Sequence, residues 1–232
     1  MKAIIVFSGG QDSTTCLYWA INRYEEVEAI TFDYGQKHSV EIEQSKKILR
    51  NLNIKQTIVS LNESLGVLAE SALIGEGKDV SKINKYGLPD SFVPGRNGIF
   101  LYNAYIYALK SNADIIVTGV TESDYSGYPD CRQEFIDSLI YTMDLGVFGK
   151  RSSFTIETPL MYLTKAKIFE LAEKEGCLKE VIEDSHTCYN GKRSYKYEWG
   201  WSSERDTKKD PLCPACKLRK KGWDEYKNFL DK

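Results

Sequence analysis

The chain has 232 residues, of which 42% are hydrophobic and 28% charged, and its formal net charge is −2. This length holds one sizeable α/β core with a small appendage, but hardly two independent domains. The near-neutral charge excludes a global attraction to nucleic acid or membranes, and no apolar run approaches the roughly 20 residues that cross a bilayer.

The N-terminal residues 1–7 lack the longer apolar core and cleavage site of a signal peptide. Six cysteines are unevenly spread along the chain, and two of them form Cys213-Pro-Ala-Cys216. In a cytoplasmic protein this spacing indicates metal or redox chemistry rather than disulfides. We therefore expect a cytoplasmic location.

The first part of the chain alternates between strand and helix patterns. β-branched and apolar runs predict strands, and apolar residues at helical spacing predict helices. In chain order the pattern predicts a strand at 2–7, a helix at 13–24, a strand at 27–32, a helix at 40–52 and a strand at 54–59. This order is typical of a doubly wound parallel sheet.

Residues 60–94 break this alternation and predict a long loop with a short helical piece around 65–69. The alternation then resumes with a helix at 99–110, a strand at 114–118, a polar loop at 119–130, a helix to about 145, a strand at 154–156 and a helix at 164–175. Thr164 is the expected N-cap of the last of these helices. Beyond Gly176 the regular signals fade, so we expect an α/β domain at 1–176 and a C-terminal appendage at 177–232.

A glycine-bearing loop, Ser8-Gly9-Gly10-Gln11-Asp12-Ser13, joins the first strand to the first helix. Glycines let the backbone approach an anion closely, and a helix N-terminus offers free N–H groups. The alternative is a plain strand–helix turn capped by Ser13. No Lys-Ser or Lys-Thr pair follows the glycines, so this is not a Walker A loop.

The hexapeptide resembles the PP-loop of the ATP pyrophosphatase superfamily. This resemblance implies a PP-loop, HUP-like fold, ATP cleaved between its α and β phosphates, and transfer of AMP to a carboxyl or carbonyl oxygen, with ATP and Mg²⁺ as cofactors. The ATP-binding residues that it implies are Phe7, Ser8, Gly9, Gly10, Gln11, Asp12, Ser13, Thr14, Thr15, Phe32 and Gly119.

Further motifs follow the predicted strands at their carboxyl ends, the edge where open α/β sheets bind ligands. They are Phe32 to His38, Val93 to Asn97, Thr118 to Val120 with Asp124 to Arg132, and Glu157 to Leu160 with Lys165. Together with Ser185 to Gly191 and the Cys213/Cys216 pair, they resemble the 7-cyano-7-deazaguanine synthase family over residues 6 to about 222. The resemblance implies conversion of 7-carboxy-7-deazaguanine to the amide and then the nitrile, with ammonia and ATP at each step, in queuosine biosynthesis.

Adenylation turns one carboxylate oxygen into a leaving group, and cations aimed at the pyrophosphate lower the barrier. We expect Lys165 to be the cation that stabilises the pyrophosphate, with Asp12 and Ser13 as further catalytic residues. The alternative is that Lys165 is a solvated lysine at a helix start. Arg96 could clamp a carboxylate or a phosphate, or brace the long loop. The expected substrate-binding residues are Tyr34, Arg96, Asn97, Asp124, Tyr125, Ser126, Asp130 and Arg132.

Cys188, Cys213 and Cys216 resemble ligands of a structural Zn²⁺ ion, which favours four sulfur or nitrogen donors. The family has a fourth cysteine three residues before the Cys213 position, where this chain has Asp210. Asp210 could supply an oxygen ligand, and His186 is the substitute. Thiols without metal are the alternative.

Several alternatives stay open. A close relative could ligate the activated acid to another amine, such as one on a protein docked at residues 192–209, where basic and aromatic residues alternate. That segment could also be an enlarged zinc loop. A tRNA-thiolating PP-loop enzyme and a module that binds nucleotide without cleaving it are further alternatives. A homodimer is a hypothesis, and neither membrane nor nucleic acid is required.

Overall fold

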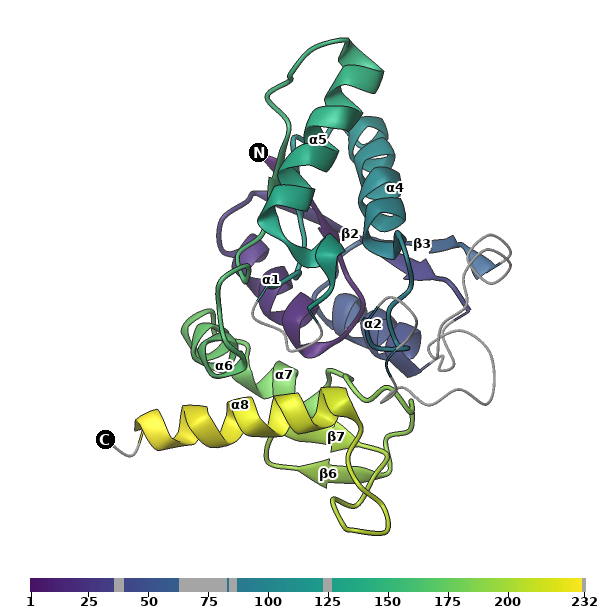
Figure 1. The fold of residues 1–232 in the computed structure, drawn as a ribbon. Coiled ribbons are helices and arrows are strands. Elements are labelled where there is room, and N and C mark those ends of the chain that lie inside the picture. The colour runs from purple at the N-terminus through teal and green to yellow at the C-terminus, as the bar shows by residue number, and fades with distance from the viewer. Residues whose placement is uncertain (36–39, 63–82, 84–86, 123–126, 231–232) are drawn as a thin grey trace.

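The computed structural model describes residues 1–35, 40–62, 83, 87–122 and 127–230 (Figure 1). Three of the expected substrate-binding residues, Asp124, Tyr125 and Ser126, therefore lie outside the described residues. The same is true of the short helical piece expected around 65–69.

A five-stranded parallel sheet in the order β3-β2-β1-β4-β5 forms the centre of the chain. Its strands are β1 (Lys2–Val6), β2 (Glu26–Asp33), β3 (Gln56–Ser60), β4 (Ile115–Val117) and β5 (Thr155–Glu157). The predicted doubly wound α/β class is confirmed. The strand order reverses between β1 and β4, and ligands of such sheets bind beyond the strands' carboxyl ends at this point.

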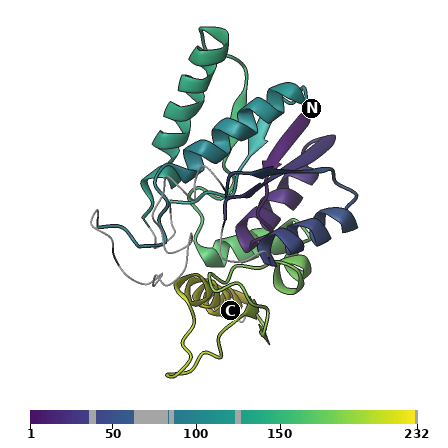
Figure 2. The ribbon, with the colours of Figure 1, turned by 90° about the vertical axis from the view of Figure 1, so that its right-hand side faces the viewer.

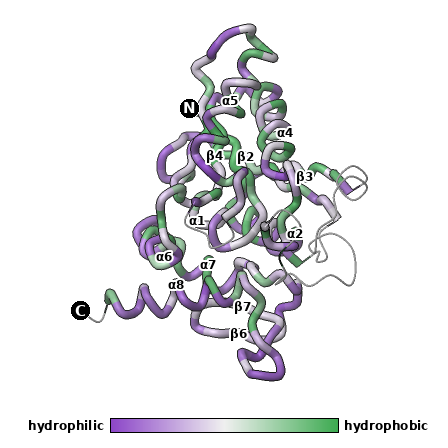
Figure 3. The backbone as a smooth tube through the Cα atoms, viewed as in Figure 1, coloured by the Kyte–Doolittle hydropathy of each residue, from purple (hydrophilic) through white to green (hydrophobic). Residues whose placement is uncertain are grey.

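Helices cover both faces of the sheet (Figures 1 and 2). One face packs against α4 (Arg96–Lys110) and α5 (Gln133–Phe148), and the other against α1 (Gln11–Ile21), α2 (Val40–Asn51) and part of α6 (Lys165–Lys174). Strand side chains alternate between the two layers: Ile4 joins the first, and Ala3 and Ile5 join the second. The apolar strands accordingly run through the middle of the molecule (Figure 3).

Thr164 is the N-cap of α6, as predicted, and its side chain accepts a hydrogen bond from the Lys167 N–H. A 3₁₀ turn, η1 (Pro129–Cys131), leads into α5. In the described part of the chain, no helix has both the length and the apolar character that crossing a membrane requires.

Regular structure continues beyond Gly176, and the prediction that it fades there is wrong. The appendage contains α7 (Leu178–Glu183), the antiparallel strands β6 (Tyr195–Tyr197) and β7 (Gly200–Ser202), and α8 (Pro214–Leu230). Pro214 stands at the first position of α8, which is a helix-start signal. The helix was missed because lysines and Arg219 interrupt its buried stripe of Cys216, Trp223 and Tyr226.

Helix α8 packs on α6, so the appendage and the α/β domain share a core around Phe169 and Trp223. The division at residue 176 therefore separates two parts that bury apolar surface against each other, and it remains a proposal. Gly222 lies where the two helices are closest: a Cβ there would lie 2.9 Å from the carbonyl carbon of Lys165.

We predict that Gly222→Ala destabilises the protein by about 1–3 kcal/mol, because the new methyl group overlaps backbone atoms of α6. Gly146→Ala in α5 is the matched control, since a Cβ there meets nothing within 4 Å. That variant should be neutral or more stable by up to about 1 kcal/mol, as alanine favours helix over glycine. Chemical denaturation measures both. Equal stability of the two variants would contradict this close packing.

Candidate active site

The loop between β1 and α1 takes its shape from Gly9. This residue has a φ of +83°, and a Cβ on it would lie 2.9 Å from the Glu41 carbonyl oxygen and from the Ser45 nitrogen. Only glycine combines that backbone conformation with so close an approach. Gly10 caps α1 without a side-chain hydrogen bond, so the helix N-terminus keeps N–H groups suited to an anion.

Several buried polar atoms of the loop have no hydrogen-bond partner among the described residues. They are both amide atoms of Gln11, Oδ1 of Asp12 and Oγ1 of Thr14. An unsatisfied buried polar group costs about 1–3 kcal/mol. Such a concentration of unpaired donors and acceptors at a helix N-terminus fits a phosphate-bearing ligand.

The predicted catalytic residues lie together. Lys165, at the start of α6, donates to Asp12 Oδ2 at 2.7 Å, and its side chain is 9% exposed. Ser13 Oγ lies 3.1 Å from Ser8 Oγ within the loop. Gly119, which follows β4, lies against the same loop, since a Cβ on it would lie 3.2 Å from the Ser13 nitrogen.

The side chains of three other predicted ATP-binding residues pack against or hydrogen-bond to other parts of the protein. The Phe7 side chain is 1% exposed in the core, and its backbone bonds to Ile30 and Thr31 of β2. Phe32 stacks on Phe100 with ring centroids 4.4 Å apart. The Thr15 hydroxyl donates to the Gln11 carbonyl one turn earlier. Their side chains support the loop.

A second group of predicted residues meets around the start of α4. The guanidinium of Arg96 lies over the Tyr34 ring, 5.8 Å from its centroid. The Asn97 N–H donates to Asp130 Oδ2 at 3.2 Å, while Asp130 Oδ1 and Arg96 Nε have no partner among the described residues. Arg132 is exposed and stands at the N-cap position of α5.

Burial shifts the pKa values of three titratable groups, two of them beside Gly9 and one in the group around the start of α4. It raises the pKa of Glu41 to about 7, with Arg96 opposing the shift. It lowers the pKa of His186 to about 4, so this imidazole is neutral at pH 7. Burial also raises the pKa of Asp130, against its hydrogen bond from Asn97.

Three cysteines and one glutamate form a buried cluster in the appendage. The ligand atoms of Cys188, Glu204, Cys213 and Cys216 all lie within 4.8 Å of one another. The sulfur atoms of Cys188 and Cys213 are 4.0 Å apart, close to the ~3.8 Å separation that tetrahedral zinc–sulfur bonds give. The hydrogen bond that the Cys213 thiol donates to the Cys188 sulfur raises the pKa of Cys213 to about 12. The cluster thus fits a cation that replaces the thiol protons.

The structure places Glu204, and not Asp210 or His186, beside the three sulfur atoms, which corrects the expected fourth position. Glu204 is held by Ser202, whose hydroxyl donates to its Oε2 at 2.6 Å, and by Asn190. Asp210 instead accepts from the Arg205 N–H in an outer turn. The backbone N–H of His186 donates to the Gly9 carbonyl, and neither imidazole nitrogen belongs to the cluster. Glu204 was missed because it stands in a charged stretch and is not spaced from a cysteine or histidine as metal ligands usually are.

The aromatic residues of the segment 192–209 pack on the appendage itself. Trp199 is 3% exposed and stacks on Tyr197 with ring centroids 4.8 Å apart. Trp201 donates to the Glu183 carbonyl, and Arg193 lies over its ring. This packing favours the enlarged-loop interpretation over a surface of exposed aromatic anchors.

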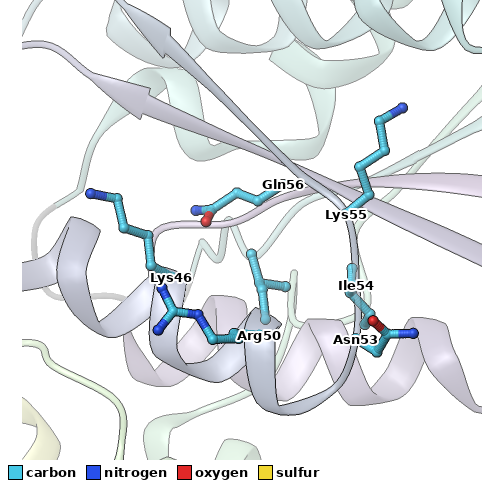
Figure 4. Close-up of a pocket in the computed structure, with 7 residues that line it drawn as sticks. Lys46, Arg50, Asn53, Ile54, Lys55 and Gln56 are labelled. Carbon is cyan, nitrogen blue, oxygen red and sulfur yellow. The ribbon is translucent and has the colours of Figure 1, made fainter.

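A hollow of about 420 Å³ between α2 and β3 lies apart from these clusters (Figure 4). It opens at the amino end of β3, the edge opposite the glycine loop. Two of its cations are paired, Lys46 with Glu43 and Lys55 with Glu28. Since ligand sites of such sheets lie at the carboxyl ends, we assign it no role in the chemistry.

Comparisons with known proteins agree on the family. A family model described as Queuosine biosynthesis protein QueC matches residues 2–227. The 7-cyano-7-deazaguanine synthase of Wolinella succinogenes is 50% identical over 231 residues, which cover 98% of this chain and 94% of that protein. That of Lysinibacillus sphaericus is 48% identical over 228 residues, covering 98% and 96%.

Among solved structures, a 4-thiouridine synthetase–RNA complex with bound ATP has a TM-score of 0.51 and 21% identity, covering 78% of this chain and 42% of that one. At this identity it supports the fold alone. The near-complete alignment to the two synthases carries the assignment: the chain belongs to the QueC family of queuosine biosynthesis proteins.

Proposed function

We propose that this chain converts 7-carboxy-7-deazaguanine to 7-cyano-7-deazaguanine with ATP and ammonia. The observation that carries the proposal is the 50% identity to a 7-cyano-7-deazaguanine synthase over nearly the whole chain. Members of this family are ATP-using enzymes, and the unpaired polar atoms of the glycine loop support a phosphate ligand here. The tRNA-thiolating alternative is not favoured.

The proposed reaction runs through two adenylations. A carboxylate oxygen of the substrate attacks the α-phosphorus of ATP and pyrophosphate leaves. Ammonia then adds to the activated carbonyl carbon, AMP departs and the amide forms. In the second cycle the amide oxygen attacks another ATP, and departure of AMP with loss of two protons leaves the nitrile.

The loop and Lys165 supply electrostatic stabilisation in this mechanism. Loop N–H groups and the Lys165 ammonium lie where negative charge builds up on the departing pyrophosphate. Asp12 Oδ2 holds the lysine in place at 2.7 Å. Asp12 Oδ1, which has no partner among the described residues, is the candidate ligand for a Mg²⁺ ion that neutralises phosphate charge.

The second cluster is the proposed substrate site. Arg96 presents donors for the carboxylate of the acid, and the Asn97–Asp130 pair offers a donor and an acceptor to the purine-like ring. Tyr34 lies against Arg96 and closes one side. Asp124, Tyr125, Ser126 and Arg132 remain proposed contacts on sequence grounds.

We further propose a Zn²⁺ ion bound by Cys188, Glu204, Cys213 and Cys216. Three sulfurs and one carboxylate oxygen satisfy its preference for four ligands, and Ser202 and Asn190 orient the carboxylate. The closed, buried cluster suits a structural ion. It would tie α8 to the segment that follows α7.

Partners and location remain proposals. Exposed apolar side chains on α4 and α5, including Ile106, Tyr141 and Phe148, support the hypothesis of a homodimer. The tryptophans of residues 192–209 pack inward. This packing argues against a protein partner that docks there and presents an amine in place of ammonia. The cytoplasmic location rests on the sequence.

The reaction is tested by product analysis on the wild type and on Lys165→Met. The wild type should form AMP, pyrophosphate and the nitrile from ATP, ammonia and the acid. Lys165→Met should lower kcat about 10²–10³-fold, because a donor aimed at developing charge is lost. Lys167→Ala, on the same helix but exposed and paired with Glu170, is the control. Formation of ADP and phosphate alone would exclude the adenylation mechanism.

Arg96→Lys should raise the KM for the acid about tenfold or more, because lysine keeps the charge but loses the two-pronged donor geometry. Its melting temperature should stay close to that of the wild type. Arg50→Lys on the exposed side of α2 is the matched control. If Arg96→Lys melts early and keeps its KM, the arginine is structural.

Metal analysis tests whether Glu204 or Asp210 is the fourth ligand of the proposed Zn²⁺ ion. The wild type should hold about one Zn²⁺ per chain, and X-ray absorption should find three sulfur neighbours and one oxygen. Glu204→Gln should lose the metal to a chelator at least about tenfold more readily, and Asp210→Asn should behave as the wild type. Retention by Glu204→Gln together with loss by Asp210→Asn would restore Asp210 as the ligand.

A further inference from the structure

Thr187, from the segment after α7, reaches the phosphate loop. Its Oγ1 accepts a hydrogen bond from the Gln11 N–H at 3.3 Å and another from Arg219 Nη1 at 3.0 Å. A hydroxyl oxygen has two lone pairs and one hydrogen. Because both lone pairs are used, the hydroxyl hydrogen is left to donate, and no acceptor for it is found among the described residues.

Arg219, on α8, stands behind this hydroxyl as a buried cation. The residue is 0% exposed, and its Nη2 donates to the Val181 carbonyl at 2.6 Å. In the described part of the chain no carboxylate forms an ion pair with it. Burial lowers its pKa to about 10, so it stays charged at pH 7. Among the described residues, only the longer-range attraction of Cys216 and Asp12 supports this buried charge, and an arriving anion would stabilise it further.

A glycine makes room for the Arg219 guanidinium. The guanidinium packs directly on Gly200 of β7, where a Cβ would overlap it. Thr187 is half-buried, so its hydroxyl lies between the enclosed guanidinium and the loop. The arrangement leaves one polarised O–H available to donate beside the N-terminus of α1, whose Gln11 N–H bonds to the same oxygen.

We propose that Thr187 donates a hydrogen bond to the pyrophosphate end of ATP, and that Arg219 positions this hydroxyl and adds positive charge behind it. The appendage thereby completes the phosphate site of the α/β domain. The inference rests on the proposed function in taking ATP as the ligand. Both residues stand beside cluster cysteines, Thr187 next to Cys188 and Arg219 three residues after Cys216.

The test measures binding of Mg²⁺-pyrophosphate by calorimetry to the full-length, metal-loaded protein. Thr187→Val removes the hydroxyl at equal size and should weaken binding about tenfold or more. Thr187→Ser keeps the hydroxyl and should restore binding to within about threefold. Thr142→Val is the matched control, because that hydroxyl donates only within α5. Metal content should stay unchanged in all three, and Thr187→Val alone should melt earlier, because it leaves Gln11 N–H and Arg219 Nη1 without their acceptor.

Arg219→Lys and the double variant test the positioning role. Arg219→Lys should weaken binding in the wild-type background and have little further effect in Thr187→Val, because the two residues act through one hydroxyl. Wild-type affinity in Thr187→Val overturns the inference. So does a joint loss of binding and metal in Thr187→Ser. If the wild-type protein itself binds neither pyrophosphate nor ATP, the proposed function fails first.

Discussion

The missing side chain of Gly9 is the constraint on which the site depends. Its positive φ and its contact with the backbone of α2 turn the chain from β1 into α1 within a few residues. The Gly9 carbonyl also accepts a hydrogen bond from the backbone N–H of His186. The turn therefore contacts the segment that follows α7. The direction of α1, the place of Asp12 and the seating of the appendage all follow from one backbone conformation.

Hydrogen bonding is unevenly distributed over the molecule. Structural carboxylates are fully engaged: Glu28 pairs with two lysines and a tyrosine, and Asp144 accepts from Tyr105 and Ser152. Most of the unpaired buried side-chain atoms found among the described residues lie instead in or near the glycine loop, at Gln11, Asp12, Thr14 and His186, and at Arg96 and Asp130; Arg219 and Trp223 of α8 contribute one each. Native proteins rarely leave such atoms unpaired, so their concentration distinguishes the parts built for a ligand from those built for stability.

Much of the sheet could be predicted from the sequence because its strands are short apolar runs and its helices keep a 3.6-residue period. The loop was predictable because glycines and hydroxyl residues are adjacent in sequence. Helix α8 was not, since Arg219 lies in its buried face and local hydropathy cannot recognise a buried cation with backbone partners. Glu204 could not be found either, because its approach to the cysteines depends on the β6–β7 hairpin.

The packing of α8 across α6 has a consequence for synthesis on the ribosome. Every strand of the central sheet precedes α8 in the chain, so the sheet and its loop can form before Cys213, Cys216 and Arg219 have emerged. A nascent chain at that stage would hold a folded domain with an open side. Because α8 closes that side last, the order of translation itself delays completion of the proposed phosphate site until the rest of the fold is in place.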